Sequence, residues 1–136
     1  MRVVYRTSKS LPKAEVLRLY RSVQWSAAKK PTRLLRALQQ SHSVVSAWVD
    51  GSLVGLGNAI SDRSLVVYYP HLLVSPDFQR RGIGREIMRR LMNRYRGFHQ
   101  HMLVADAEAA GFYRACGFTR AGKTISMWVF KGAEHG

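Results

Sequence analysis

The segment LLVSPDFQRRGIGREIM, residues 72–88, constrains the fold most, because it joins an apolar strand to an amphipathic helix through a loop with two glycines. The strand is predicted over Leu65–Val74, and Ser75-Pro76-Asp77 ends it. The helix is predicted to run to about Tyr95, with apolar residues on one side and arginines on the other. A strand that leads into such a helix requires a sheet covered by a helix layer, which predicts an α/β fold.

The loop between them has the features of an anion-binding site. Gly82 and Gly84 allow the backbone to turn tightly and to approach a ligand closely. The first N–H groups of the following helix point at the loop, and the helix dipole favours negative charge there. Arg80, Arg81 and Arg85 add charge-assisted donors. The sequence lacks GxxxxGK[ST] and does not match GxGxxG, which excludes a P-loop and disfavours a dinucleotide-binding fingerprint.

Strand and helix patterns alternate along the rest of the chain. Asp50-Gly51 predicts a tight hairpin turn, and Gly117 stands where a helix C-terminus favours glycine. The order β-α-α-β-β-β-α-β-α-β-β predicts a mixed sheet. The other predicted elements are a strand at Val3–Arg6, a helix from Leu11 or Pro12 to Trp25, a helix after Pro31 with Thr32 as its N-cap, a hairpin of Ser43–Val49 and Leu53–Ile60, a strand at His101–Ala105, a helix capped by Asp106 and ending at Cys116, and closing strands at Phe118 and Ile125–Phe130.

The composition fits one soluble domain over residues 1–136. A length of 136 residues is enough for one core, and 46% hydrophobic with 22% charged residues is ordinary for a globular chain. No apolar run approaches the ~20 residues of a membrane helix, and the first residues contain no signal-peptide core. Cys116 is the only cysteine, which excludes an internal disulfide. We therefore expect a soluble cytoplasmic domain with no membrane partner.

The charge balance is the most unusual property of the composition. Lys and Arg number 22 against 8 Asp and Glu, a formal net charge of +14. Such an excess indicates either a polyanionic partner or helices coated with solvated charge. The arginines are densest over residues 80–96, which are the predicted anion loop and its helix. A phosphate-bearing ligand thus accounts for part of the charge, and nucleic acid is not the partner we expect.

Two motifs at the expected separation resemble the GNAT superfamily of acyl-CoA-dependent N-acetyltransferases, in its small single-domain form. Gln79, Gly82 and Gly84 match the pattern [Q/R]-x-x-G-x-[G/A], which Val74-Ser75-Pro76 precedes in the typical way. A second pattern, A-x-x-F-Y-x-x-x-G-F, is matched by Ala109, Phe112, Tyr113, Gly117 and Phe118. The resemblance covers residues 66–118, and the predicted element order agrees with that fold over nearly the whole chain.

The resemblance implies acetyl-CoA as co-substrate and no metal. It places the pyrophosphate on the loop amides and the pantetheine arm beside the preceding strand, where an N–H of Leu72 or Leu73 would stabilise the oxyanion. Asp106 stands where the family often has Asn, which puts a pantetheine contact by this residue in doubt. The implied cofactor-binding residues are Leu72, Leu73, Val74, Gln79, Arg80, Arg81, Gly82, Ile83, Gly84, Arg85 and Asp106.

The implied reaction is direct attack of a neutral amine on the thioester, through a tetrahedral intermediate. Tyr113 matches the tyrosine that commonly protonates the leaving thiolate, although an aromatic residue near a helix end also fits simple core packing. His71 is the best-placed candidate base, because its ordinary pKa suits neutral pH and the strand before the loop has no carboxylate. A histidine hydrogen-bonded within the sheet explains it as well. Asp62 is a second candidate base, but a turn-forming Asp is the simpler interpretation.

The acceptor is expected to be a small-molecule amine. Trp25, Tyr68 and Tyr69 are candidates for an aromatic acceptor pocket, and core packing explains them equally well. With so few carboxylates, an amino-acid-like or arylalkylamine acceptor fits better than a polycation. Two alternatives stay open, an acetyl-CoA-binding regulatory module with little turnover and a basic nucleic-acid-binding protein. The family often pairs subunits through its C-terminal strands, so Ile125–Phe130 make a homodimer possible.

Overall fold

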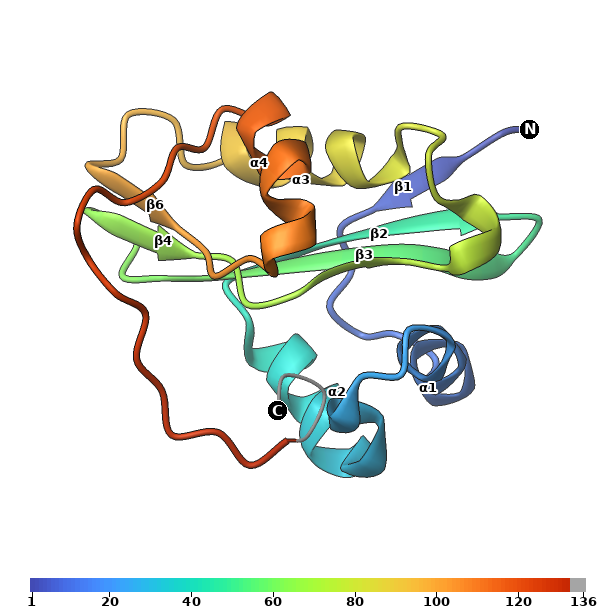
Figure 1. The fold of residues 1–136 in the computed structure, drawn as a ribbon. Coiled ribbons are helices and arrows are strands. Elements are labelled where there is room, and N and C mark those ends of the chain that lie inside the picture. Colours follow the sequence, from blue (N-terminus) through green and yellow to red (C-terminus); the bar gives the residue numbers. More distant parts are fainter. Residues whose placement is uncertain (133–136) are drawn as a thin grey trace.

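The computed structural model describes residues 1–132, and a six-stranded mixed sheet forms its centre (Figure 1). The strand order is β1-β2-β3-β4-β6, with β5 also paired to β3; β4 and β6 run parallel and the other pairs antiparallel. The strands are β1 (Val4–Arg6), β2 (Ser43–Val49), β3 (Ser52–Ser61), β4 (Val66–Tyr68), β5 (Leu72–Val74) and β6 (Gln100–Met102). The helices are α1 (Lys13–Ser22), α2 (Pro31–Gln40), α3 (Ile83–Asn93) and α4 (Ala110–Ala115), with single 3-10 turns η1 (Ser26–Lys29), η2 (Pro76–Phe78) and η3 (Ala107–Ala109).

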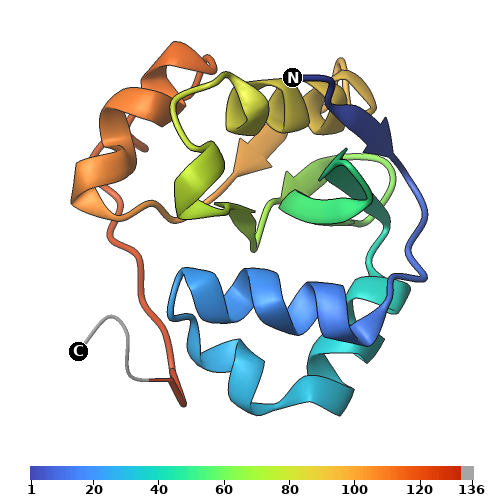
Figure 2. The same cartoon turned by 90° about the vertical axis from the view of Figure 1, so that its right-hand side faces the viewer.

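The sheet separates two apolar cores. On one face lie α1 and α2, and on the other lie α3 and α4 (Figures 1 and 2). The first core is built on Val16, Tyr20 and Leu38, and the second on Ile87 and Leu91. The predicted α/β fold with a mixed sheet is confirmed. The prediction of one domain over residues 1–136 includes 133–136, which lie outside the described residues.

Two glycines of β3 let α3 approach the sheet closely. A Cβ at Gly57 would lie 2.8 Å from Cγ2 of Ile87 and 2.9 Å from Cδ1 of Leu91. A Cβ at Gly55 would lie 3.0 Å from Cδ1 of Ile87. The helix side chains therefore rest on backbone at both positions, and side chains there would push α3 outward.

The turn predicted at Asp50-Gly51 and the helix end predicted at Gly117 are both confirmed. Asp50 and Gly51 both have positive φ, 48° and 79°, as a type I′ hairpin turn between β2 and β3 requires. At the end of α4, Gly117 has φ 102° and its N–H donates to the carbonyl of Arg114. The N–H of Phe118 donates to the carbonyl of Tyr113, which completes a Schellman motif.

The strand predicted over Leu65–Val74 is divided into β4 and β5. Residues 69–71 interrupt it, with Pro70 at the centre. β3 pairs with both β4 and β5. On its other edge β4 pairs with β6, whereas β5 has no second strand partner in the described residues. The sheet is consequently split on this side, and one edge of β5 is open beside β6.

The closing strands predicted at Phe118 and Ile125–Phe130 are wrong in this structure. Residues 117–132 contain no strand, and the segment leaves the sheet and runs toward α2 (Figure 1). Ile125, Met127 and Val129 are 85%, 91% and 92% exposed. The β-branched and aromatic residues of this segment fit a strand, but a strand also needs a neighbouring edge to satisfy its backbone, and no described strand pairs with this segment.

Some helix boundaries were predicted wrongly. The first helix was expected to reach Trp25, but α1 ends at Ser22. Thr32 was expected to cap α2, but Pro31 is already its first helical residue and Lys30 is the N-cap. Asp106 was expected to cap the helix that ends at Cys116. Its side chain makes no capping hydrogen bond, and its backbone carbonyl accepts the N–H of Ala109 instead.

We predict that Gly57→Ala destabilises the fold by about 1–3 kcal/mol, because the added methyl overlaps Ile87 and Leu91. The matched control is Gly111→Ala in α4, where a Cβ meets nothing within 4 Å and φ is not positive. Helix propensity makes that change neutral or stabilising by up to ~1 kcal/mol. Urea unfolding measures both. Equal stability of the two variants would contradict the close packing of α3 on β3.

Candidate functional site

The loop between β5 and α3 is shaped by two residues of positive φ. Arg80 has φ 64° and Gly82 has φ 81°, and Gly82 is the residue immediately before the first turn of α3. The Gln79 side chain fixes the loop to the preceding strand, because its Nε2 donates to the carbonyl of Val74 at 3.0 Å. The guanidinium carbon of Arg81 lies 5.5 Å from the centroid of the Phe78 ring. The predicted role of Gly82 in a tight turn is thus supported by its backbone geometry.

The N-terminus of α3 presents backbone donors at this loop. The first helical hydrogen bond runs from the N–H of Glu86 to the carbonyl of Gly82, at 3.0 Å. Within residues 1–132, the N–H groups of Ile83, Gly84 and Arg85 have no carbonyl partner. Together with the helix dipole, three such donors form an anion-binding cradle.

The open edge of β5 adjoins this cradle. The N–H of Asn58 donates to the carbonyl of His71, and the N–H of Ser75 donates to that of Val54, both across to β3. In an antiparallel pair, every second residue directs its backbone N–H and C=O at the neighbouring strand, so the backbone groups of Leu73 also point at β3. Leu72 and Val74 therefore direct their backbone groups at the open edge. Of the two expected oxyanion donors, the register favours the N–H of Leu72.

Gly84 serves a different purpose from Gly82. A Cβ at Gly84 would lie 3.3 Å from Cζ of Phe112 and 3.6 Å from Cγ2 of Val74. The residue thus allows α4, β5 and the start of α3 to meet closely. This contact brings the two sequence motifs together, since Gly84 belongs to the first and Phe112 to the second.

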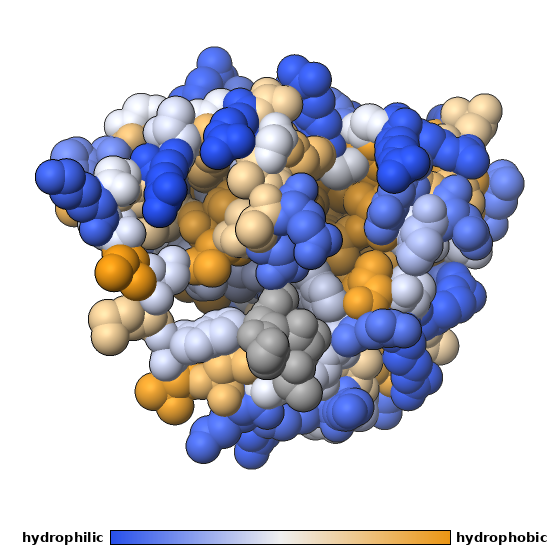
Figure 3. Space-filling view, viewed as in Figure 1, coloured by the Kyte–Doolittle hydropathy of each residue, from blue (hydrophilic) through white to orange (hydrophobic). Residues whose placement is uncertain are grey.

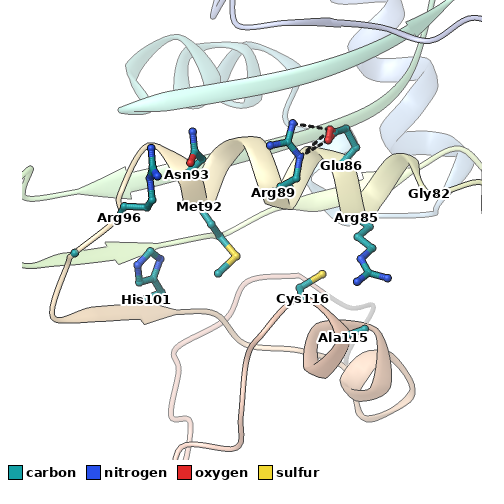
Figure 4. A pocket seen from close by; sticks show the side chains of 11 residues that line it. Gly82, Arg85, Glu86, Arg89, Met92, Asn93, Arg96, His101, Ala115 and Cys116 are labelled. Atoms are coloured by element: carbon teal, nitrogen blue, oxygen red, sulfur yellow. Dashed lines mark hydrogen bonds and ion pairs between the residues drawn. The ribbon is translucent and has the colours of Figure 1, made fainter.

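A cavity of about 730 Å³ lies between α3 and the end of α4 (Figure 4). Arg85, Arg96 and His101 line it, and Cys116 forms part of its wall. Glu86 is the acidic residue of the lining, and Arg89 pairs with its carboxylate at 3.0 Å. The cavity is therefore net positive. Burial raises the pKa of the Cys116 thiol, as in a structural and unreactive cysteine.

Tyr113 lies among aromatic rings in α4. It makes edge-to-face contacts with Phe112 at 5.0 Å and with Phe118 at 6.0 Å between ring centroids. Burial, together with Cys116 and Asp106, raises the pKa of Tyr113 to about 12. Its hydroxyl is therefore protonated at neutral pH, as a proton donor must be.

His71 lies on the other side of the split strand and is held from three directions. Its Nδ1 is 2.8 Å from the Tyr20 hydroxyl. The backbone N–H of His71 donates to Oδ1 of the buried Asn58 at 3.0 Å, and Nδ2 of Asn58 donates to the Ser41 hydroxyl. The rings of Trp25 and His71 are 5.4 Å apart in an edge-to-face contact. Both expectations for His71 are compatible with this position, since it is anchored to the sheet and adjoins Trp25.

The other candidates are placed apart from His71. One carboxylate oxygen of Asp62 accepts the N–H groups of Ser64, Leu65 and Val66. These bonds, that of Leu65 most, lower the pKa of Asp62 and make it a turn residue. Tyr69 hydrogen-bonds to Nδ1 of His101.

The predicted aromatic grouping with Trp25 is wrong for Tyr69, for which the alternative of core packing is confirmed. The ring contacts of Trp25 are with Tyr20 and His71. Tyr69 packs instead against Tyr95 and Phe118, on the α3 face of the sheet. Successive residues of a strand point to opposite faces, and the break at Pro70 changes that alternation.

Sequence reasoning missed Tyr20 and Asn58 as site residues. Tyr20 lies on the apolar stripe of its helix, and its 0% exposure is that of a core residue. Asn58 is a polar residue inside an apolar strand, with 4% exposure. A buried amide in a strand needs partners, so its presence in the sequence was a usable signal.

Fold and site together define an α/β domain with an anion-binding helix N-terminus beside a split strand. A family model described as "Acetyltransferase (GNAT) domain" matches residues 16–130. The chain therefore belongs to the GNAT acetyltransferase family. Within residues 1–132, no helix has the length and apolar character needed to cross a membrane.

Individual relatives agree with this assignment. "GCN5-related N-acetyltransferase 3, chloroplastic" of Arabidopsis thaliana is 35% identical over 84 residues, 59% of this chain and 35% of that protein's length. The chain thus spans about a third of this relative. A GNAT-family acetyltransferase structure from Streptococcus pneumoniae superimposes with TM-score 0.83 at 26% identity, covering 96% of this chain and 99% of that one. AAC(6')-Iy, solved with a bisubstrate analogue of CoA, shares the fold at TM-score 0.75 and 16% identity, covering 96% and 99% of the two chains.

We predict that Tyr113 keeps its proton well above pH 10.0, its ordinary pKa. Because the folded state holds this proton more tightly than the unfolded state, the associated stability is lost as the pH rises from 10 toward 12. Carbon-13 NMR of the tyrosine rings, assigned with Tyr113→Phe, measures the midpoint. A midpoint near 10 would show that the ring is not desolvated.

Proposed function

We propose that this chain transfers an acetyl group from acetyl-CoA to a primary amine of a small molecule. The observation that carries the proposal is the junction of the α3 cradle with the open edge of β5. The N–H groups of Ile83, Gly84 and Arg85 would bind the pyrophosphate, and Leu72–Val74 would lie along the pantetheine arm. The other proposed cofactor-binding residues are Gln79, Arg80, Arg81, Gly82 and Asp106.

The basic surface supports this co-substrate. A phosphomonoester such as the 3′-phosphate of CoA carries roughly −1.5 to −2 charges near pH 7. Arg85 and Arg96 line the cavity beside the cradle. Arg89 and Arg90 are partly neutralised by Glu86, and Arg90 also lies 4.5 Å over the Tyr5 ring. Figure 3 shows the molecule in the orientation of Figure 1, with hydrophilic side chains around the rim and apolar ones toward the middle.

The chemistry we propose assigns one task to each group. The acceptor nitrogen attacks the acetyl carbon to form a tetrahedral intermediate and loses its proton to His71, and the carbon–sulfur bond then breaks. The Leu72 N–H stabilises the oxyanion, a contact often worth ~3 kcal/mol. Tyr113, neutral because its pKa is raised to about 12, gives its proton to the leaving sulfur. His71 lies at the acceptor side, and we propose it as the second catalytic residue.

The proposed acceptor site is formed by Trp25 and His71, with the buried ring of Tyr20 packed behind them. The three ring pairs are 5.4 to 5.9 Å apart and meet edge to face. None of the three side chains is a carboxylate, and the whole sequence holds 8 acidic residues against 22 basic ones. An aromatic amine, or one that bears an acid group, fits this surface better than a polycation.

We predict that Gly82→Ala weakens acetyl-CoA binding by about tenfold, because a Cβ is strained at φ 81° and shifts the amides of the cradle. Gly51→Ala is the matched control: φ there is 79°, and at neither glycine does a Cβ meet anything within 4 Å. Gly51 lies in the β2–β3 turn, so its variant should be equally strained but bind normally. Titration calorimetry measures both affinities.

Turnover is tested by amine-dependent release of CoA over a panel of aromatic and acid-bearing amines. Release by the unaltered protein supports the proposed reaction. Acetyl-CoA binding without release for any amine would favour the regulatory-module alternative. Equal loss of affinity in Gly51→Ala and Gly82→Ala would remove the cradle from the cofactor site.

We also propose a homodimer formed through the C-terminal segment. Met127 and its neighbours form an exposed apolar segment, and β6 ends the strand order of the described sheet. Pairing this segment with a β6 edge of a second copy would cover both. Light scattering should give twice the chain mass of 15.5 kDa, and Met127→Lys should reduce it. A monomer at micromolar concentration would contradict the proposal.

A further inference from the structure

The first two helices carry a basic surface on the face of the sheet away from the α3 cradle. Residues 13–40 hold seven basic side chains and one acidic one, Glu15. All seven basic residues are exposed, and hydrophilic side chains cover the lower edge of the molecule over α1 and α2 (Figure 3). The α1–α2 basic surface consists of Lys13, Arg18, Arg21, Lys29, Lys30, Arg33 and Arg36.

Carboxylates neutralise little of this surface. Glu15 pairs with Arg18, and its Oε1 also accepts the backbone N–H of Leu53 at 2.8 Å. Within residues 1–132, none of the other six basic side chains pairs with a carboxylate. Surface charge that serves solubility alone normally mixes both signs, so an unmixed surface indicates an anionic partner.

The charges at the start of α2 oppose the helix that carries them. Lys30 is the N-cap of α2, Arg33 lies in its first turn, and that turn contains no acidic residue. The N-terminus of a helix carries a partial positive charge, so cations there are unfavourable for folding. These residues therefore do not stabilise the helix, whereas a bound polyanion would relieve their mutual repulsion.

The α1–α2 basic surface fits a nucleic-acid backbone better than a membrane. Leu17, Leu34 and Leu38 point into the core, and residues 13–40 expose no large apolar side chain. A surface helix that binds a bilayer needs such side chains to insert. The exposed neighbours of the cations include polar residues of the kind that contact phosphates, namely Ser22, Thr32, Gln39 and Gln40.

The size of the surface also suits a duplex. Each helix has ten residues and is therefore about 15 Å long. A duplex of that length carries about nine phosphate charges, which is comparable to the number of cations on the surface. The sheet lies between this surface and α3, so a ligand on the α3 cradle leaves it uncovered (Figures 1 and 2).

We propose that the α1–α2 basic surface binds the phosphate backbone of a nucleic-acid duplex, independently of base sequence. This replaces the solvated charge that the sequence alone also allowed. The contact is electrostatic and leaves the acetyl-transfer site on the other face of the sheet accessible. The binding is a further activity and does not depend on the proposed acetyl transfer.

Fluorescence anisotropy of a labelled DNA duplex tests this binding on the full chain. We expect the logarithm of the affinity to fall against the logarithm of the salt concentration with a slope of about −4, as for four to five phosphate contacts. Affinity then falls about 250-fold between about 50 and 200 mM salt. Two duplexes of unrelated sequence should bind alike, and saturating acetyl-CoA should displace neither. Absence of binding at low salt, or displacement by acetyl-CoA, would overturn the proposal.

Paired substitutions locate the contact. Arg33→Gln combined with Arg36→Gln should make the slope less steep by about two, because each removes one phosphate contact. Arg33→Lys with Arg36→Lys keeps the charge and should keep the slope. The charge-matched control is Arg94→Gln with Arg114→Gln, exposed residues at the ends of α3 and α4, which should leave the slope unchanged. Equal flattening in both glutamine pairs would remove this surface from the contact.

Vesicles of phosphatidylcholine and phosphatidylserine separate a membrane from a nucleic acid. At equal salt we expect the duplex to bind more tightly, because the surface offers phosphate donors and no side chain to insert into a bilayer. Tighter binding to the vesicles would assign the surface to a membrane and contradict the proposal. Amine-dependent release of CoA is a separate readout, so a failure of the proposed acetyl transfer leaves this test unaffected.

Discussion

The close packing of α3 on β3 determines where the chemistry of this protein can occur. Gly55 and Gly57 remove the side chains that would hold the helix away, so Ile87 and Leu91 rest on the strand backbone. The helix axis is thereby fixed, and its N-terminal amides are directed at the loop after β5. Without this contact, the cradle would not adjoin the open strand edge.

The break at Pro70 gives the sheet two functional sides. Beyond it, β5 stays on β3 while β4 pairs with β6, which leaves the backbone of Leu72 and Val74 unpaired by a strand. On the α3 side, the opening meets a net-positive cavity. On the α1 side, it meets Tyr20, Trp25 and His71. A thioester and an amine can approach the same strand edge from these two directions.

Local features of the sequence predicted local structure well. Gly82, the Asp50-Gly51 turn and the Gly117 helix end depend on backbone angles that few residues adopt, so the residue type at each position predicted them. Features that depend on distant partners were not predictable in this way. The 125–130 segment has apolar residues typical of a strand but no strand beside it in the described residues, Trp25 meets His71 because the strand breaks at Pro70, and Tyr20 differs from a core residue only through one hydrogen bond. The net charge of +14 indicated an anionic ligand but not its site.

The central claim is that acetyl-CoA lies on the α3 cradle and along the open edge of β5. Amide hydrogen exchange, followed residue by residue with and without acetyl-CoA, tests this most directly. On adding acetyl-CoA, we expect slower exchange of the backbone amides of Leu72, Val74, Ile83, Gly84 and Arg85. The amide of Leu73 already points at β3, so its exchange should change little. Protection confined to the basic surface of α1 and α2, or none at saturating acetyl-CoA, would contradict it.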